Sequence, residues 1–144
     1  MITVSKATAE DIVSFVKNIR SMDAEEVFRY SGKSIETQVV DLYEQGALVI
    51  KDENAILGIG GYRKGTYPGS LLGWMLLTKA VERHKVSFLK WSKRYVEDLL
   101  KDHKYIFNIV YKKNKLHMDY LKFLCATFFD EPGEDFILFR IERR

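Results

Sequence analysis

Apolar positions in the first third of the chain recur at helical spacing after one short alternating run. Residues 2–5 alternate apolar and polar side chains, which predicts a strand. Three helix patterns follow: one capped by Thr8 with Asp11 three residues later, one starting at Ser21 or Asp23 and ending before Gly32, and one from Ser34 to Gly46. We therefore expect three small helices before the main sheet.

From residue 47 the apolar pattern becomes that of strands. The runs 47–50 and 55–62 predict a hairpin, and glycines in the second run leave room for another backbone or a ligand to approach closely. Further elements are predicted as a strand over 71–78, a helix over 86–103, a strand over 105–111, a helix over 115–125, and strands over 127–129 and 136–141. The strand–helix–strand unit predicts parallel strands with a right-handed crossover. The fold class is therefore α/β, with a mixed central sheet flanked by helices.

Length and composition limit the number of domains and the kinds of site that the chain can form. A chain of 144 residues with 47% hydrophobic and 30% charged residues predicts one folded domain over residues 1–144. The single cysteine excludes an intramolecular disulfide, which favours a reducing compartment, and zinc-ligand spacing is absent. No apolar run has the length of a bilayer span and the amino terminus lacks a signal-peptide pattern, so we expect a cytosolic protein.

Charge is distributed unevenly along the chain. Residues 1–72 carry 8 basic and 10 acidic side chains, whereas residues 79–122 carry 12 basic and 5 acidic ones. Such a basic segment suits an anionic partner, which could be a cofactor phosphate, nucleic acid or an acidic protein, and it equally suits a solvated helix face.

The predicted element order resembles the GNAT acyltransferase fold. In that family, acetyl-CoA lies where two central parallel strands splay apart, here bordered by Leu77, Thr78 and Asn108. Its pyrophosphate rests on backbone N–H groups in a glycine-containing loop at the start of the crossover helix. The corresponding residues 79–87, which include Lys85, Val86 and Ser87, contain no glycine, so we expect acetyl-CoA to bind weakly or not at all.

A second GNAT landmark lies in the helix after residue 111. Asn114 matches the family pattern, but Leu121 stands at the position of the tyrosine general acid and Cys125 at that of a glycine. Tyr120 is about 100° further round the helix and would point elsewhere. The family's catalytic acid is therefore not carried over.

A narrower resemblance is to internal virion protein A of short-tailed bacteriophages. The residues that carry it are Trp74 to Thr78, Phe88-Leu89-Lys90, and the series Asn108, Asn114, His117, Tyr120, Leu121 and Lys122, with Asp23 and Glu26 as an earlier pair. This resemblance implies a phage protein needed for a productive particle or for DNA ejection. It further implies a location in the cytoplasm of an infected bacterial cell or in the virion, with phage virion proteins or a host protein as partners.

Several candidate site residues have a structural and a chemical interpretation. Asn114 is expected to cap the helix after it through its side-chain oxygen, and His117 is either a hydrogen-bonded structural residue or a general base. Asn108 is expected to brace a neighbouring strand or the opening. Glu26, with Asp23, is either part of a surface ion-pair network or a base for a substrate amine. Cys125 is expected to pack as a small hydrophobe.

Three functions follow from these patterns. The preferred one is a structural, ejection or interaction factor with a degenerate acetyl-CoA site. The alternative is an acetyl-CoA-dependent N-acetyltransferase of an amine or protein acceptor, with Glu26 or His117 as base and N–H groups around Lys85, Val86 and Ser87 holding phosphate. A nucleic-acid-binding module that uses the basic segment ranks third. We expect no metal site.

Overall fold

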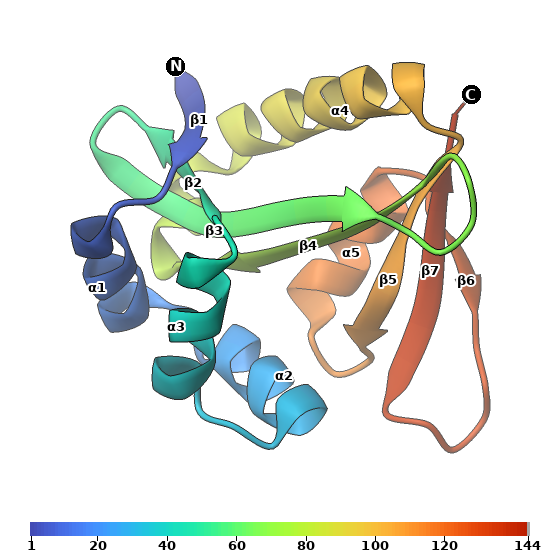
Figure 1. Ribbon diagram of the computed structural model, residues 1–144, viewed down its shortest axis with the longest axis horizontal. Coiled ribbons are helices and arrows are strands. Elements are labelled where there is room, and N and C mark those ends of the chain that lie inside the picture. Colours follow the sequence, from blue (N-terminus) through green and yellow to red (C-terminus); the bar gives the residue numbers. More distant parts are fainter. Residues whose placement is uncertain (144) are drawn as a thin grey trace. The chain divides into compact units, whose positions relative to one another are not determined.

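The computed structural model describes residues 1–143; Arg144, the last residue of the predicted domain, lies outside them. The strands are β1 (Ile2–Lys6), β2 (Leu48–Asp52), β3 (Ala55–Lys64), β4 (Ser70–Leu77), β5 (Tyr105–Tyr111), β6 (Thr127–Phe129) and β7 (Phe136–Glu142). The helices are α1 (Ala9–Asn18), α2 (Ser21–Ser31), α3 (Ile35–Glu44), the 3₁₀ helix η1 (Lys79–His84), α4 (Lys85–Asp102) and α5 (Lys115–Phe123) (Figure 1). The chain forms two compact units, Met1–Gly61 with Met75–Trp91 and Tyr62–Trp74 with the residues from Ser92 onward.

The first unit is built on the antiparallel strands β1, β2 and β3. Val4 of β1 pairs with Ile50 of β2, and Val49 of β2 pairs with Ile59 of β3. The predicted hairpin is confirmed, but its strands run further than expected, since Lys51 and Asp52 still pair with β3. Hydrogen-bonded strand neighbours follow the order β1-β2-β3-β4-β5-β7-β6, so the predicted mixed α/β fold is confirmed.

The three helices of the first unit begin and end where local signals predict. Thr8 accepts a hydrogen bond from the Asp11 N–H and the Asp11 carboxylate accepts one from the Thr8 N–H, which completes the capping box of α1. Helix α2 ends at Gly32, whose φ of 72° is the left-handed conformation that glycine adopts easily. Ser34 caps α3 by accepting from the Thr37 N–H.

Close packing of β3 against β4 depends on a glycine. A Cβ atom at Gly58 would clash with the backbone carbonyl oxygen of Leu76 and lie 2.9 Å from Cδ2 of Leu77. The predicted close backbone approach in this glycine-rich strand is therefore confirmed. Around it lies an apolar core that includes Phe15, Val27, Ile35, Val39, Val49, Leu57 and Ile59.

The second unit holds the parallel pair of the predicted crossover. The first residues of β4 pair in parallel with β5, from Ser70 opposite Tyr105 to Leu72 opposite Phe107. Strand β7 pairs antiparallel with β5 on one side and with β6 on the other. The last strand in the sequence is thus inserted between β5 and β6.

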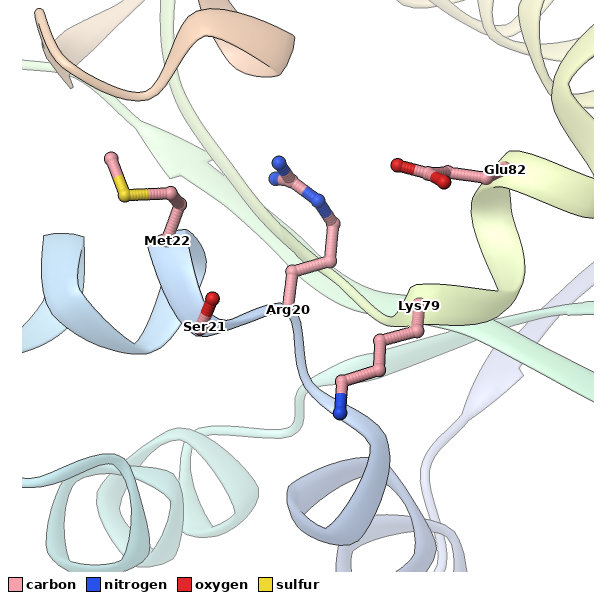
Figure 2. A pocket seen from close by; sticks show the side chains of 5 residues that line it. All are labelled: Arg20, Ser21, Met22, Lys79 and Glu82. Atoms are coloured by element: carbon pink, nitrogen blue, oxygen red, sulfur yellow. The ribbon is translucent and has the colours of Figure 1, made fainter.

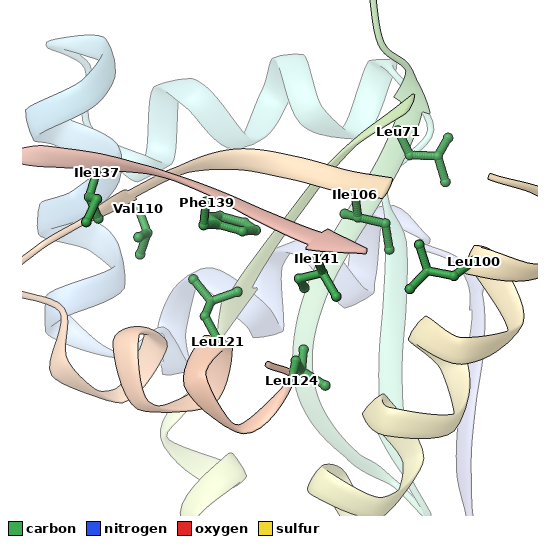
Figure 3. Close-up of a cluster of buried hydrophobic side chains, with 9 residues drawn as sticks. All are labelled: Leu71, Leu100, Ile106, Val110, Leu121, Leu124, Ile137, Phe139 and Ile141. Carbon is green, nitrogen blue, oxygen red and sulfur yellow. The ribbon is translucent and has the colours of Figure 1, made fainter. Parts of the chain in front are cut away.

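One hydrophobic cluster fills one face of this second sheet segment. Figure 3 shows side chains of β5 and β7 pointing toward α5 and the end of α4. Its buried members are Leu71, Leu100, Ile106, Val110, Leu121, Leu124, Ile137, Phe139 and Ile141. In β7 alternate residues are buried here, as expected for a strand covered by helices on one side.

The segment between β4 and α4 differs from the sequence-based expectation. Residues 79–84, which precede the helix predicted over 86–103, form the 3₁₀ helix η1, and α4 continues from it at Lys85 without a break. The helical stretch therefore begins at Lys79. Within residues 1–143, no helix is both long and apolar enough to cross a bilayer.

Candidate functional site

In the first unit, residues 19–23 lie along the end of β4. Ile19 forms an isolated antiparallel bridge with Thr78, and the Arg20 backbone N–H donates to the Leu77 carbonyl at 3.0 Å. Ile19 and Arg20 connect α1 to α2, and residues 21–23 begin α2, so the two helices are fixed to the strand at their junction. We refer to residues 19–23 as the β4 clamp.

Asp23 anchors the β4 clamp from a fully buried position. Its side chain is 0% exposed, one carboxylate oxygen pairs with the Arg20 guanidinium, and the other accepts the Leu77 backbone N–H at 2.6 Å. The expectation of surface ion pairing for Asp23 was therefore wrong. Val27, four residues later on the same helical face, is also buried, and that spacing is the signal that could have placed Asp23 inside.

Together these contacts occupy one edge of β4 at Leu77. The Thr78 N–H donates to the Leu57 carbonyl of β3 at 2.8 Å, so Thr78 faces β3. Successive residues of a strand direct their backbone polar groups to opposite edges, so the Leu77 groups face away from β3. The clamp takes both of them, the N–H through Asp23 and the C=O through Arg20.

Thr78 is fully buried and its hydroxyl serves the fold. Its Oγ1 donates to the Ile56 carbonyl at 2.7 Å and accepts from the Ala80 N–H at 3.3 Å, while the Thr78 carbonyl accepts from the Val81 N–H at 3.3 Å. Two donors at the start of the helical stretch, the N–H groups of Ala80 and Val81, are thus satisfied by Thr78.

Lys85, Val86 and Ser87 are exposed and follow a complete turn of η1. In a continuous helix the carbonyls of the preceding turn are positioned to accept from the N–H groups of such residues. The unsatisfied donors that hold a phosphate at a helix start therefore do not arise at these three positions.

A cavity of about 360 Å³ lies between the β4 clamp and η1. It is lined by Arg20, Ser21, Met22, Lys79 and Glu82. Figure 2 shows the Glu82 carboxylate extending toward the Arg20 side chain, whereas the Lys79 side chain turns away. Glu26 is half-buried one helical turn beyond Asp23 and is not among the lining residues.

In the second unit, Asn108 braces the parallel strand pair. Its Nδ2 donates to the Gly73 carbonyl of β4 at 2.8 Å, at the position that follows the pairing of Leu72 with Phe107. Its Oδ1 accepts from the Ile109 N–H at 2.7 Å. The expectation that this amide is satisfied by bracing a neighbouring strand is confirmed.

Asn114 and His117 are both buried at the start of α5. Asn114 is 0% exposed and its side chain makes no capping hydrogen bond, so the expected N-cap through its oxygen was wrong. The physical reason is its backbone, whose φ of −81° and ψ of 80° depart from the extended conformation that directs a capping side chain to the helix N–H groups. His117 is 7% exposed.

The position of the GNAT tyrosine lies in the core. Leu121 is buried in the hydrophobic cluster of the second unit. Tyr120 packs against the same cluster and its hydroxyl contacts Ser92. Burial raises the pKa of Tyr120 to about 12, an effect that the hydrogen bond with Ser92 partly offsets. Tyr120 therefore stays protonated at neutral pH.

Cys125 is exposed and has a φ of 64°, so its expected burial as a small hydrophobe was wrong. It follows the C-cap Leu124 in the left-handed conformation that usually belongs to glycine. This conformation explains why glycine is usual at the equivalent position of the GNAT pattern.

Replacing Cys125 by glycine should stabilise the protein, because glycine adopts a positive φ without steric cost. We expect a gain of about 1 kcal/mol in the free energy of unfolding, measured by urea denaturation. Cys125→Ala is the matched control, since it removes the thiol but keeps the strained Cβ. An equal gain in both variants would contradict this explanation.

In the first unit, the Asp52 carboxylate contacts both the His84 ring and the terminal amine of Met1. The hydrogen bond from His84, whose Nδ1 lies 3.0 Å from Oδ2 of Asp52, lowers the pKa of that carboxyl, and the terminal amine of Met1 acts in the same direction. His84, to which the sequence assigned no role, therefore tethers η1 to β2. Across residues 1–143 no group of three or more His, Cys, Asp or Glu side chains could hold a metal ion.

Comparison with solved structures assigns the fold. The chain is similar to a GNAT-family acetyltransferase from Bacillus cereus at 15% identity, with a TM-score of 0.60 and coverage of 100% of this chain and 99% of that one. It is similar to yncA from Salmonella typhimurium, solved with its cofactor acetyl-CoA, at 9% identity, a TM-score of 0.60 and coverage of 99% and 94%. A spermidine N-acetyltransferase SpeG chimera from Vibrio cholerae and hSSAT gives 12% identity, a TM-score of 0.66 and coverage of 98% and 95%. The chain therefore has the GNAT acetyltransferase fold.

A family model places the chain more narrowly. The model described as "Bacteriophage T7, probable scaffold protein Gp13" matches residues 46–132, more than half of the sequence, and the chain belongs to this family. None of the curated proteins matches the sequence. The expectation of a phage protein with a GNAT-like fold is thus confirmed, while the narrower likeness to internal virion protein A stays a prediction.

Proposed function

We propose that this phage protein is a structural, ejection or interaction factor, similar to internal virion protein A, that keeps the GNAT fold over a degenerate acetyl-CoA site. On this proposal residues 1–144 act as one domain, in the cytoplasm of the infected cell or in the virion. Its partners are other virion proteins or a host protein.

The observation that carries the proposal is the occupied edge of β4. A ligand that pairs with the end of this strand needs the Leu77 N–H and C=O, since its other edge is taken by β3. The Asp23 carboxylate and the Arg20 N–H already hold these two groups. The pantetheine arm of acetyl-CoA would have to displace a buried ion pair to reach them.

Two further features support a degenerate site. The helical stretch begins at Lys79 and lacks glycine through Ser87, so residues 85–87 present no phosphate cradle. Leu121 stands in the core where the GNAT pattern has its tyrosine acid.

Thermal unfolding with CoA and acetyl-CoA tests the proposal directly. We expect little or no change in Tm at ligand concentrations that give a conventional GNAT enzyme a clear shift. Ligand at 100 times its dissociation constant would add about 2.7 kcal/mol to the stability, which is easily measured. The spermidine N-acetyltransferase serves as the positive control. A shift that implies micromolar affinity would contradict the degenerate site.

The alternative is an acetyl-CoA-dependent N-acetyltransferase acting on an amine or a protein. It is favoured by the solved neighbours, one of which contains acetyl-CoA and another of which is a spermidine N-acetyltransferase. In this alternative Glu26 or His117 is the base and Asn114 supports it, while Leu77, Thr78, Lys85, Val86, Ser87 and Asn108 contact the cofactor. Acetyl transfer that is lost in His117→Ala or Glu26→Gln variants with intact folding would establish it.

A further inference from the structure

The second unit has a sheet face that its own helices do not use. Side chains of β5 and β7 alternate between two faces, and the first face holds the cluster packed on α4 and α5. The second face carries the intervening residues. Across its middle, Ile109 of β5 stands opposite Leu138 of β7, and Leu138 stands opposite Phe129 of β6.

This row is exposed although it is apolar. Ile109, Leu138 and Phe129 are 37%, 43% and 43% exposed. Three apolar side chains in register on adjacent strands form a continuous patch rather than scattered surface residues, and such patches mark interaction sites. We refer to Ile109, Leu138 and Phe129 as the apolar row.

The strand that ends this sheet is an open edge. Strand β6 is the last in the strand order and pairs only with β7 among the described strands. Arg140 lies over the rings of Tyr105 and Phe129 at 5.3 and 5.4 Å, which holds a cation beside the apolar row. The face therefore combines apolar surface with an arginine that is ion-paired with Glu142.

Charge differs between the two ends of these strands. The turn from β6 to β7 carries four exposed acidic side chains, Asp130, Glu131, Glu134 and Asp135, of which Asp130 pairs with Lys112. At the opposite end lie Lys104, the ion pair of Arg140 with Glu142, and Arg143, whose guanidinium donates to backbone carbonyls at the end of α4 and leaves this end with a net positive charge. One end of the face is thus acidic and the other basic.

From this pattern we propose that the face binds a second copy of the chain as a two-fold dimer centred on the apolar row. A two-fold axis that runs along the row reverses the strand direction in the second copy. The acidic turn of each copy then meets the basic end of the other, and the two apolar rows stack face to face. An axis parallel to the strands would instead bring like charges together, so the charge distribution selects the first arrangement.

Sedimentation velocity over a wide range of protein concentrations tests the dimer. We expect the unmodified chain to associate and Leu138→Glu to raise the dissociation constant about tenfold or more, because each dimer would bury two unpaired carboxylates. Val40→Glu is the matched control: Val40 is a 52% exposed apolar residue of α3 in the first unit and not part of the apolar row, so this variant should associate normally. Circular dichroism checks that both variants fold.

Two further measurements examine the arrangement. Association should weaken as salt is raised, since it pairs unlike ends. A spin label on Cys125, the single cysteine and an exposed one, should give one defined distance between copies in the unmodified background and none in Leu138→Glu. A chain that stays monomeric at its highest concentration, equal behaviour of the Leu138 and Val40 variants, or association that salt does not weaken would each overturn the proposal.

Discussion

Replacement of Asp23 by alanine should lower the free energy of unfolding by about 3 kcal/mol, because it breaks a buried ion pair and leaves its other partner without compensation. Asp23 is 0% exposed and Arg20 only 15%. The Leu77 N–H, which donates to Asp23 at 2.6 Å, would also lose its acceptor. Urea denaturation monitored by circular dichroism measures the loss.

The same variant should release the β4 clamp. Trypsin cleaves after arginine, and Arg20 lies within this segment, so we expect faster cleavage at Arg20 in Asp23→Ala than in the unmodified chain. Asp23→Asn should lie between the two, since an amide oxygen can still accept from Leu77 but carries no charge. Glu25→Ala is the control, because its pair with Arg29 is exposed and contributes at most about 0.5 kcal/mol. Equal destabilisation by Glu25→Ala and Asp23→Ala would contradict the anchoring role.

Replacement of Gly58 by alanine should cost roughly 3 kcal/mol, because the added Cβ would meet backbone rather than a movable side chain. The obstructing atom is the Leu76 carbonyl oxygen, and Cδ2 of Leu77 lies 2.9 Å from the added carbon. Strands β3 and β4 would have to move apart, and with them the Thr78 hydrogen bonds to Ile56 and Leu57. The free energy of unfolding is again the measurement.

Gly73→Ala provides the comparison in the neighbouring strand. A Cβ there would lie 3.0 Å from Cγ2 of Ile106, a side-chain methyl group that can shift. We expect a cost of about 1 kcal/mol, clearly smaller than at Gly58. If both variants lost the same stability, the close approach of β3 to the Leu76 carbonyl would not be the determining contact.

Asp23 and Gly58 act on the two opposite edges of β4. The β4 clamp closes one edge of β4, and the packing at Gly58 fixes the other edge against β3. A strand that is hydrogen-bonded on both edges near Leu77 and Thr78 is a structural element rather than an open binding platform. This property is the main observation that supports the degenerate acetyl-CoA site proposed above.

Part of the candidate site could be predicted from local sequence. The absence of glycine over residues 79–87 led us to expect weak acetyl-CoA binding, and Leu121 at the tyrosine position led us to expect that the family's acid is not carried over; both stay predictions. Asn108 was expected to brace a strand because a buried amide must be satisfied, and it does so at Gly73. The 3₁₀ helix η1 was missed because short 3₁₀ turns carry no apolar period of their own.

The sequence by itself determined the element types and most of their bounds. Some signals act within a few residues and can be recognised without the rest of the chain. They are the capping box of Thr8 and Asp11, the left-handed Gly32 and the alternating runs of the strands. The parallel relation of β4 and β5 also followed from the crossover helix between them.

Only the tertiary structure decided what depends on contacts between distant residues. The burial of Asp23 is set by the Leu77 N–H, 54 residues away, which local spacing does not reveal. The insertion of β7 between β5 and β6 leaves the local pattern of each strand unchanged, because alternation fixes which face is buried but not which neighbour lies at each edge. Burial and edge pairing are properties of the whole fold, and they determine which backbone groups at the end of β4 are already hydrogen-bonded.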